Sequence, residues 1–457
     1  MRASLSRWLR RRMHGAGSAR ALPADESESR DVFLRYIPEL AEPVPALPAE
    51  RPRYLTPSSS REDLRVSAAD ATAQSSFFQR LPFEIRRRIL VEAFGGHTVH
   101  MDLSFDHPEL PLDKTYFDGS ITHLSNHGNH NRDTENETRQ ATPRHKVDPS
   151  LPKRWIWRSS DCHRNPPWDT RSDEHNKYKD RAVNASEDRC RFGGAEGYFC
   201  QLWPGERPHK CFVGAMGWLL SCRQAYCEGV DVLYGTNTIH TASKQMLLHL
   251  DKLLLPQRLS TIRSVELVWH FKPYPSNSSS LAGPLDDLRT FYTFLETIPR
   301  IFPNLTTFYL ALWGDLTPTR EHNGRQVWMD EAQSIEITNR DIMSPIDRMV
   351  SKLGPKLKQC TIALGSLEYQ IRRRQAVEAG DVKVEQIHLQ HLQERHWRPL
   401  KNNSGGLEGY WVQLGHRELS RVYMCSMGEP PQNLTPPEDE VLFQPWYLLG
   451  EPRHLAM

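Results

Sequence analysis

The sequence lacks any long apolar run. No stretch approaches the ~18 consecutive apolar residues that a membrane-spanning helix needs, so we expect no membrane partner. Apolar residues make up 38% of the 457 residues and charged residues 25%, a composition typical of a globular core. An excess of charge is also missing. The net charge is only +2, and without a basic field we do not expect nucleic acid to be a partner.

Motifs that carry catalysis are missing as well. The chain has no G-x-x-x-x-G-K-[ST] phosphate loop, no G-x-G-x-x-G turn, no H-E-x-x-H and no G-x-S-x-G. These patterns hold phosphates, dinucleotides and zinc, or present a serine nucleophile. We therefore expect a protein that is not an enzyme, with no catalytic residue and no cofactor.

Paired cysteine motifs are the third absence. The eight cysteines are scattered, without C-x2-C spacing, and no secretory signal peptide precedes them. We expect reduced thiols in a cytoplasmic or nuclear protein. The first 24 residues contain six arginines and no acid, as mitochondrial transit peptides do, so a mitochondrial location is the alternative.

The best metal candidates are Cys190, Cys200, His209 and Cys211, which lie within 22 residues of one another. Three thiolates and an imidazole suit tetrahedral zinc. However, the spacing C-x9-C-x8-H-x-C lacks paired knuckles, and small buried thiols among aromatic residues explain the same cluster. We predict no metal site and keep a zinc-stabilised or nucleic-acid-associated scaffold as the alternative function.

Composition also divides the chain. Residues 1–75 are basic and proline-rich without an apolar period, which predicts a disordered arm. Residues 121–150 contain too few apolar side chains to offset their ordering entropy, which predicts a disordered loop. A proline-rich C-terminal segment covers 426–457. Residues 76–425 remain as one composite domain.

The stretch "LPFEIRRRILVEAF", residues 81–94, predicts a helix. Pro82 suits its first turn, Glu84 suits the positive end of its dipole, and Gly95-Gly96 ends it in a left-handed conformation. Arginines 86–88 are expected in water. The apolar residues that recur at helical spacing are Ile85, Ile89, Leu90, Ala93 and Phe94.

Three further patterns predict elements. Residues 99–105 alternate between apolar and polar side chains, as a half-buried strand does. The stretch "IHLQHLQERHW", residues 387–397, predicts an amphipathic helix. A strong helix is predicted around "LLSCRQAYCEGVDVLYG", and we expect one buried stripe of it at the centre of the main core, formed by Leu219, Cys222, Tyr226, Val230 and Leu233.

Tryptophan and arginine gather in "WIWRSSDCHRNPPW". Arginine beside tryptophan can stack on bases, so Arg154, Arg158 and Arg164 could serve a single-stranded nucleic acid. Trp155 and Trp157 lie at i, i+2 and share one face of a strand, where tryptophan usually packs on the core. Packing is the interpretation we favour.

Three later segments share one local pattern, with apolar residues at relative positions 0, 3 and 5. The segments begin at Ile262, Leu305 and Leu357, and each follows a helical stretch. This is the strand core of a leucine-rich-repeat-like unit, but spacings of 43 and 52 residues are too irregular for a horseshoe. We predict an α/β (α+β) fold in which irregular helix–strand repeats form one sheet after a short N-terminal helix.

One stretch resembles a known module. "LPFEIRRRIL" is similar to the first helix of an F-box, which binds a Skp-type adaptor of cullin ubiquitin ligases. Longer stretches, "LPFEIRRRILVEAFGGHTVHMDL", "CFVGAMGWLLSCRQAYCEGVDVLYGTNTIH" and "LSTIRSVELVW", resemble a fungal F-box-like family catalogued as a domain of unknown function. The resemblance implies a protein–protein interaction protein, an F-box-like substrate adaptor.

The resemblance also implies a partner-binding face, made of Leu81, Pro82, Ile85, Ile89 and Leu90. The alternative is that these residues pack on the strand at 99–105 and serve only the core. An F-box continues into two more helices, whereas this chain turns at Gly95-Gly96 into a strand.

Overall fold

The structure is a computed structural model of the full chain. All elements below belong to the compact unit formed by residues 45–457. The residues that the structure describes are 43–45, 72–108, 150–165, 184–188, 203–205, 209–270, 273–274, 284–314, 316, 318–322, 325–380, 383–388, 393–400 and 407–415. The predicted loop at 121–150, apart from Ser150, and the segment 426–457 lie outside them, as does most of the predicted arm.

Helices and strands alternate along most of the described chain. The helices are α4 (Ser76–Arg80), α5 (Phe83–Phe94), η6 (Ala185–Glu187), η8 (His209–Cys211), α7 (Ala215–Leu219), α8 (Arg223–Gly235), α9 (Lys244–Leu253), α10 (Pro256–Leu259), α11 (Pro284–Ile301), α12 (Glu331–Thr338), η9 (Asn339–Met343), α13 (Ser344–Leu353) and α14 (Ser366–Glu378). The strands are β1 (Thr98–Asp106), β2 (Arg154–Asp161), β3 (Thr238–Thr241), β4 (Ser264–His270), β5 (Thr307–Trp313), β6 (Thr319–His322), β7 (Arg325–Trp328), β8 (Gln359–Leu364), β9 (Val384–His388), β10 (Gln393–Pro399) and β11 (Gly409–Leu414).

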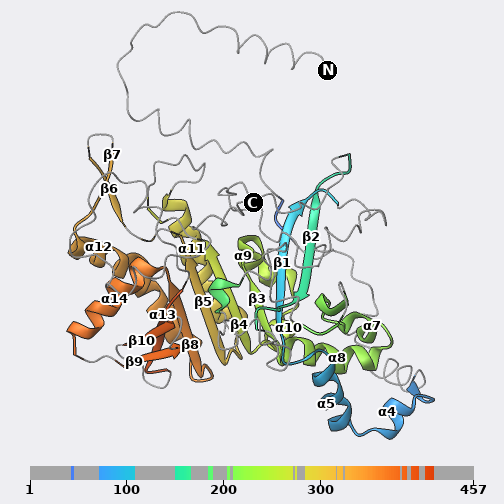
Figure 1. The fold of residues 1–457 in the computed structure, drawn as a ribbon. Coiled ribbons are helices and arrows are strands. Elements are labelled where there is room, and N and C mark those ends of the chain that lie inside the picture. The colour runs from blue at the N-terminus through green and yellow to red at the C-terminus, as the bar shows by residue number, and fades with distance from the viewer. Residues whose placement is uncertain are drawn as a thin grey trace, which may run out of the picture. The chain divides into compact units, whose positions relative to one another are not determined.

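A mixed sheet forms the centre of the fold. Its order over the described strands is β2-β1-β3-β4-β5-β8-β11-β10-β9, while β6 and β7 pair separately. The strands from β1 through β11 in this order pair in parallel, and β2, β10 and β9 join antiparallel at the edges. Parallel neighbours need crossovers, which α9, α11 and α13 supply (Figure 1). The predicted α/β class is therefore confirmed.

The repeated 0, 3, 5 pattern defines the main core. Its second and third positions fall in register across β4, β5 and β8, because Val265 pairs with Phe308 and Phe308 with Cys360. These three side chains are at most 2% exposed, and they pack under α9, α11 and α13. The prediction of neighbouring strands in one sheet is confirmed.

The stripe predicted on the strong helix is wrong in two respects. The helix breaks after Leu219, and Cys222 is the N-cap of α8, its sulfur accepting a hydrogen bond from the Ala225 N–H. Leu219 and Val230 are buried, but in a smaller apolar cluster separate from the main core, and Tyr226 is half-buried beside them.

Two strand regions also differ from expectation. The strand β1 is not half-buried, since His100 and Asp102 on its second face are buried as deeply as Met101. The stretch 387–397 is not a helix: β9 and β10 form an antiparallel pair there. No described helix is both long and apolar enough to cross a bilayer.

Candidate functional site

Helix α5 carries exposed apolar side chains. Phe83, Ile85 and Ile89 are 49%, 46% and 41% exposed. Of the other residues in the predicted partner-binding face, Pro82 is exposed, Leu81 is half-buried and Leu90 is buried. The structure therefore brings Pro82, Ile85 and Ile89 to the surface and buries Leu90. We call Ile85 and Ile89 the α5 face.

The inner face of α5 contains an arginine that was expected in water. Arg86 is only 8% exposed and donates two hydrogen bonds to the Glu228 carboxylate on α8, with Nη2–Oε1 2.6 Å and Nε–Oε2 2.9 Å. Its Nη1 also donates to the Leu81 carbonyl, at 2.6 Å. Burial alone would raise the pKa of Glu228, but hydrogen bonds from Arg86 and Gln224 outweigh it and lower that pKa. The arginine fixes the rotation of α5, with Ile85 and Ile89 outward.

A second tie joins the ends of α5 and α8. The Asn237 side-chain amide donates to the carbonyls of Phe94 and Leu233, at 2.8 and 2.9 Å, and its oxygen accepts from the His97 N–H at 2.7 Å. Gly95 permits this close approach, because a Cβ there would lie 2.6 Å from Thr236 Oγ1. Of Gly95 and Gly96, Gly96 is the one in the left-handed conformation, with φ of 71°.

Two later helices complete a helical unit around α5. Leu90 and Phe94 share an apolar cluster with Ala215 and Leu219 of α7 and with Val230 of α8. The short α4 joins them, since the rings of Phe77 and Trp218 lie 5.0 Å apart. The strands β1 and β2 are thus an insertion between the first helix and the next two (Figure 1). The sequence signal was the apolar period from Leu219 to Leu233, which we assigned to the main core and not to α5.

Further exposed apolar side chains lie on α7. Met216 and Leu220, four residues apart, are 63% and 68% exposed, although Leu219 between them is buried. Exposed apolar side chains at this spacing on two neighbouring helices are a feature of surfaces that contact other proteins.

The cysteine cluster considered for zinc is not assembled among the described residues. Cys190 and Cys200 lie outside them. His209 begins the short helix η8, and Cys211 at its end is fully buried. Of the arginines considered for nucleic acid, Arg164 is buried in an ion pair with Glu266, so it does not face a ligand at the surface.

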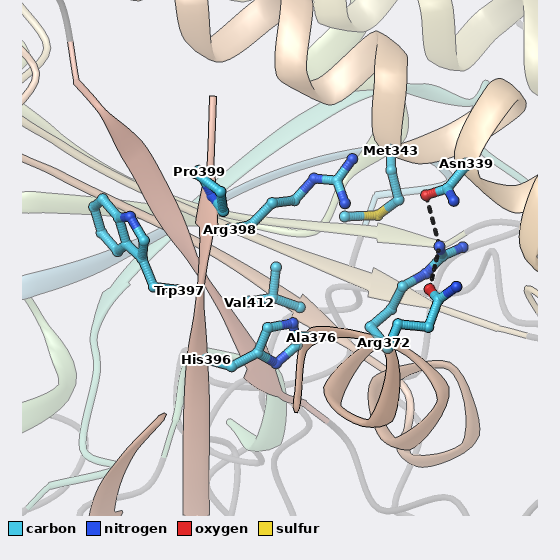
Figure 2. Close-up of a pocket in the computed structure, with 10 residues that line it drawn as sticks. Asn339, Met343, Arg372, Ala376, His396, Trp397, Arg398, Pro399 and Val412 are labelled. Carbon is cyan, nitrogen blue, oxygen red and sulfur yellow. Dashed lines mark hydrogen bonds between the residues drawn. The ribbon is translucent and has the colours of Figure 1, made fainter. Parts of the chain in front are cut away.

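A hollow of about 240 Å³ lies between η9, α14 and β10 (Figure 2). Its cations are already paired: Arg372 with Glu368 at 2.6 Å, and Arg398 with Asp347 at 2.8 Å. Burial, and then the neighbouring arginines, lower the pKa of His396 to about 4, so this ring is neutral. The charged groups around the hollow are thus held in ion pairs with each other.

Comparison with known proteins identifies the family. Residues 70–152 and 170–333 match a domain of unknown function, DUF7730. The chain belongs to this family. The DUF7730 match covers more than half of the sequence and includes α4, α5, α7, α8 and the strands from β1 to β7 except β2. No curated protein and no solved structure matched the chain.

Proposed function

We propose that this DUF7730 protein is a non-enzymatic interaction protein, and that α5 is its docking helix for a Skp-type adaptor. The observation that supports the proposal is the exposure of Ile85 and Ile89 on a helix whose opposite face is fully engaged. An isolated exposed apolar residue needs no explanation, but a pair at i, i+4 presents a continuous stripe.

The surrounding structure supports the same proposal. The F-box resemblance requires two helices beyond the first, and α7 and α8 pack on α5 although they follow it by more than 100 residues. Arg86 and Asn237 hold α5 in one orientation before a partner arrives. A preorganised surface loses less conformational entropy on binding than a mobile one.

A capture experiment tests the proposal. The purified full-length chain is mixed with a purified Skp-type adaptor, and complex formation is measured by pull-down and by calorimetry. We expect binding by the wild-type chain and loss of binding in Ile89→Asp. Because Ile89 is 41% exposed, the new carboxylate remains hydrated and the melting temperature changes little.

A matched control separates a specific face from a general effect of charge. Val377→Asp places the same charge at an apolar position that is 52% exposed on α14. This variant should bind the adaptor like the wild type. If the wild-type chain does not bind, the proposal that the partner is a Skp-type adaptor is refuted. If both variants lose binding equally, the proposal that the α5 face makes the contact is refuted.

A further inference from the structure

A row of polar side chains crosses the sheet on the face opposite the main core. The parallel register places His100 of β1 directly beside His240 of β3, and His240 beside Glu266 of β4. Both histidines are fully buried, and their rings lie 4.8 Å apart, edge to face. Neighbouring parallel strands hold such a row rigidly, since each residue is fixed by the hydrogen bonds of its strand.

The hydrogen bond to Glu266 orients His240. Its Nδ1 lies 3.2 Å from Glu266 Oε2, and a carboxylate only accepts, so the proton is on Nδ1. The Nε2 lone pair is therefore available as a ligand, and it is buried with no hydrogen-bond partner among the described residues. A carboxylate that orients a histidine in this way is the usual outer partner of a metal ligand.

A connecting segment brings a carboxylate and a thiol to the same place. Asp188, which follows η6, has a fully buried side chain with Oδ2 3.4 Å from His100 Nε2. The Cys162 Sγ donates to the same Oδ2 at 2.9 Å. The ligand atoms of His100, Asp188 and His240 all lie within 4.8 Å of one another. A tetrahedral ion that binds at about 2 Å holds its ligand atoms about 3.4 Å apart, so only a small contraction is needed.

Two buried carboxylates belong to this row. Arg164 pairs with both Asp188 and Glu266, at 3.3 and 2.5 Å. Carboxylate and imidazole groups that converge in a buried place are ligands that a divalent cation takes.

We infer that His100, His240 and Asp188 form a binding site for a divalent transition metal ion of the zinc type. Two imidazoles and a carboxylate are ligands that Zn²⁺ takes in proteins. The site is independent of the α5 face and of the cluster around Cys190. It ties β1 and β3 to the segment that covers the second face of the sheet.

Metal analysis of the wild-type chain is the first test. The full-length chain is purified without metal affinity steps, and its zinc content is measured by mass spectrometry. We expect one equivalent. After treatment with a chelator, added Zn²⁺ at a hundredfold excess over Kd should raise the melting temperature by about 5 to 10 °C. Added Co²⁺ should give the visible absorption of a bound, low-coordinate ion.

A pair of variants locates the ion. His240→Asn keeps an amide donor toward Glu266 and removes the Nε2 ligand, so we expect zinc to fall to background. His396→Asn changes another buried histidine of the same sheet and should retain the full equivalent. A wild-type chain without zinc that shows neither the temperature shift nor the cobalt absorption overturns the inference, and this result needs no variant to fold. Full zinc content in His240→Asn also overturns it, because the ion then lies elsewhere.

Discussion

The ion pair between Arg86 and Glu228 should be one of the most sensitive points of the helical unit. Arg86→Met removes the guanidinium and keeps a flexible apolar stem. The two side chains are only 9% and 10% exposed, so water cannot replace the lost partner. Glu228 would still accept a hydrogen bond from Gln224 Nε2, at 3.0 Å. Breaking a buried pair from one side costs about 3 to 5 kcal/mol, a large part of the roughly 5 to 15 kcal/mol that stabilises a domain.

Urea unfolding followed by tryptophan fluorescence measures this cost. Arg88→Met, at an exposed position two residues along α5, is the matched control and should change the free energy of unfolding by less than about 0.5 kcal/mol. The double variant Arg86→Met, Glu228→Leu removes both charges, and we expect most of the stability to return. The double-mutant cycle then gives the coupling energy of the pair.

Acid supplies an independent check. The pKa of Glu228 is lower in the folded chain than its ordinary value of 4.5, so its contribution is complete above that pH and is lost as the pH falls below it. The difference between wild type and Arg86→Met should therefore narrow below about pH 4.5. A loss of less than about 1 kcal/mol in Arg86→Met at pH 7 would refute the reasoning. The pair would then behave like an exposed salt bridge.

Three other outcomes follow from buried groups. Phe308→Ala, at a fully buried position of β5, should cost about 3 to 5 kcal/mol in urea unfolding, and a loss below 1 kcal/mol would contradict its central position. A chain that starts at Ser76 lacks Thr72, which donates to Gln224 and accepts from Gln79 Nε2, both at 3.2 Å. It should fold with its melting temperature lowered, since each hydrogen bond contributes about 1 kcal/mol. The pKa of His396 falls from 6.5 to about 4 on folding, so the stability that its neutral ring contributes is complete above pH 6.5 and is lost as the pH falls toward 4. His396→Gln should therefore make the free energy of unfolding less dependent on pH between these values. An unchanged dependence on pH would contradict the burial of His396.

Periodic apolar residues could be interpreted without the fold. The 0, 3, 5 pattern identified β4, β5 and β8 and the helices between them, because strands buried on one face must repeat the same side-chain spacing wherever they join the same sheet. Their order followed because consecutive βαβ units usually place their strands side by side. For these three strands the local sequence pattern was sufficient to predict the fold.

The orientation of α5 could not be predicted in the same way. Apolar spacing alone placed Ile85 and Ile89 with Leu90 and placed Arg86 in water. In the structure Arg86 is buried and not in water, because Glu228, 142 residues later, supplies a buried partner for it. A buried arginine and an exposed isoleucine both depend on what the rest of the chain brings to that surface.

The sequence by itself determined the α/β class and the helix–strand repeats of one sheet, since these depend on local periodicity and on residues that favour or end a helix. Only the tertiary structure decided that α7 and α8 join α5 and that His100, His240 and Asp188 meet. No spacing joins positions 100, 188 and 240, which come together because parallel register aligns β1 with β3 and a crossing segment covers them. Such contacts arise when segments that are distant in the sequence pack together, and a local sequence pattern cannot predict them.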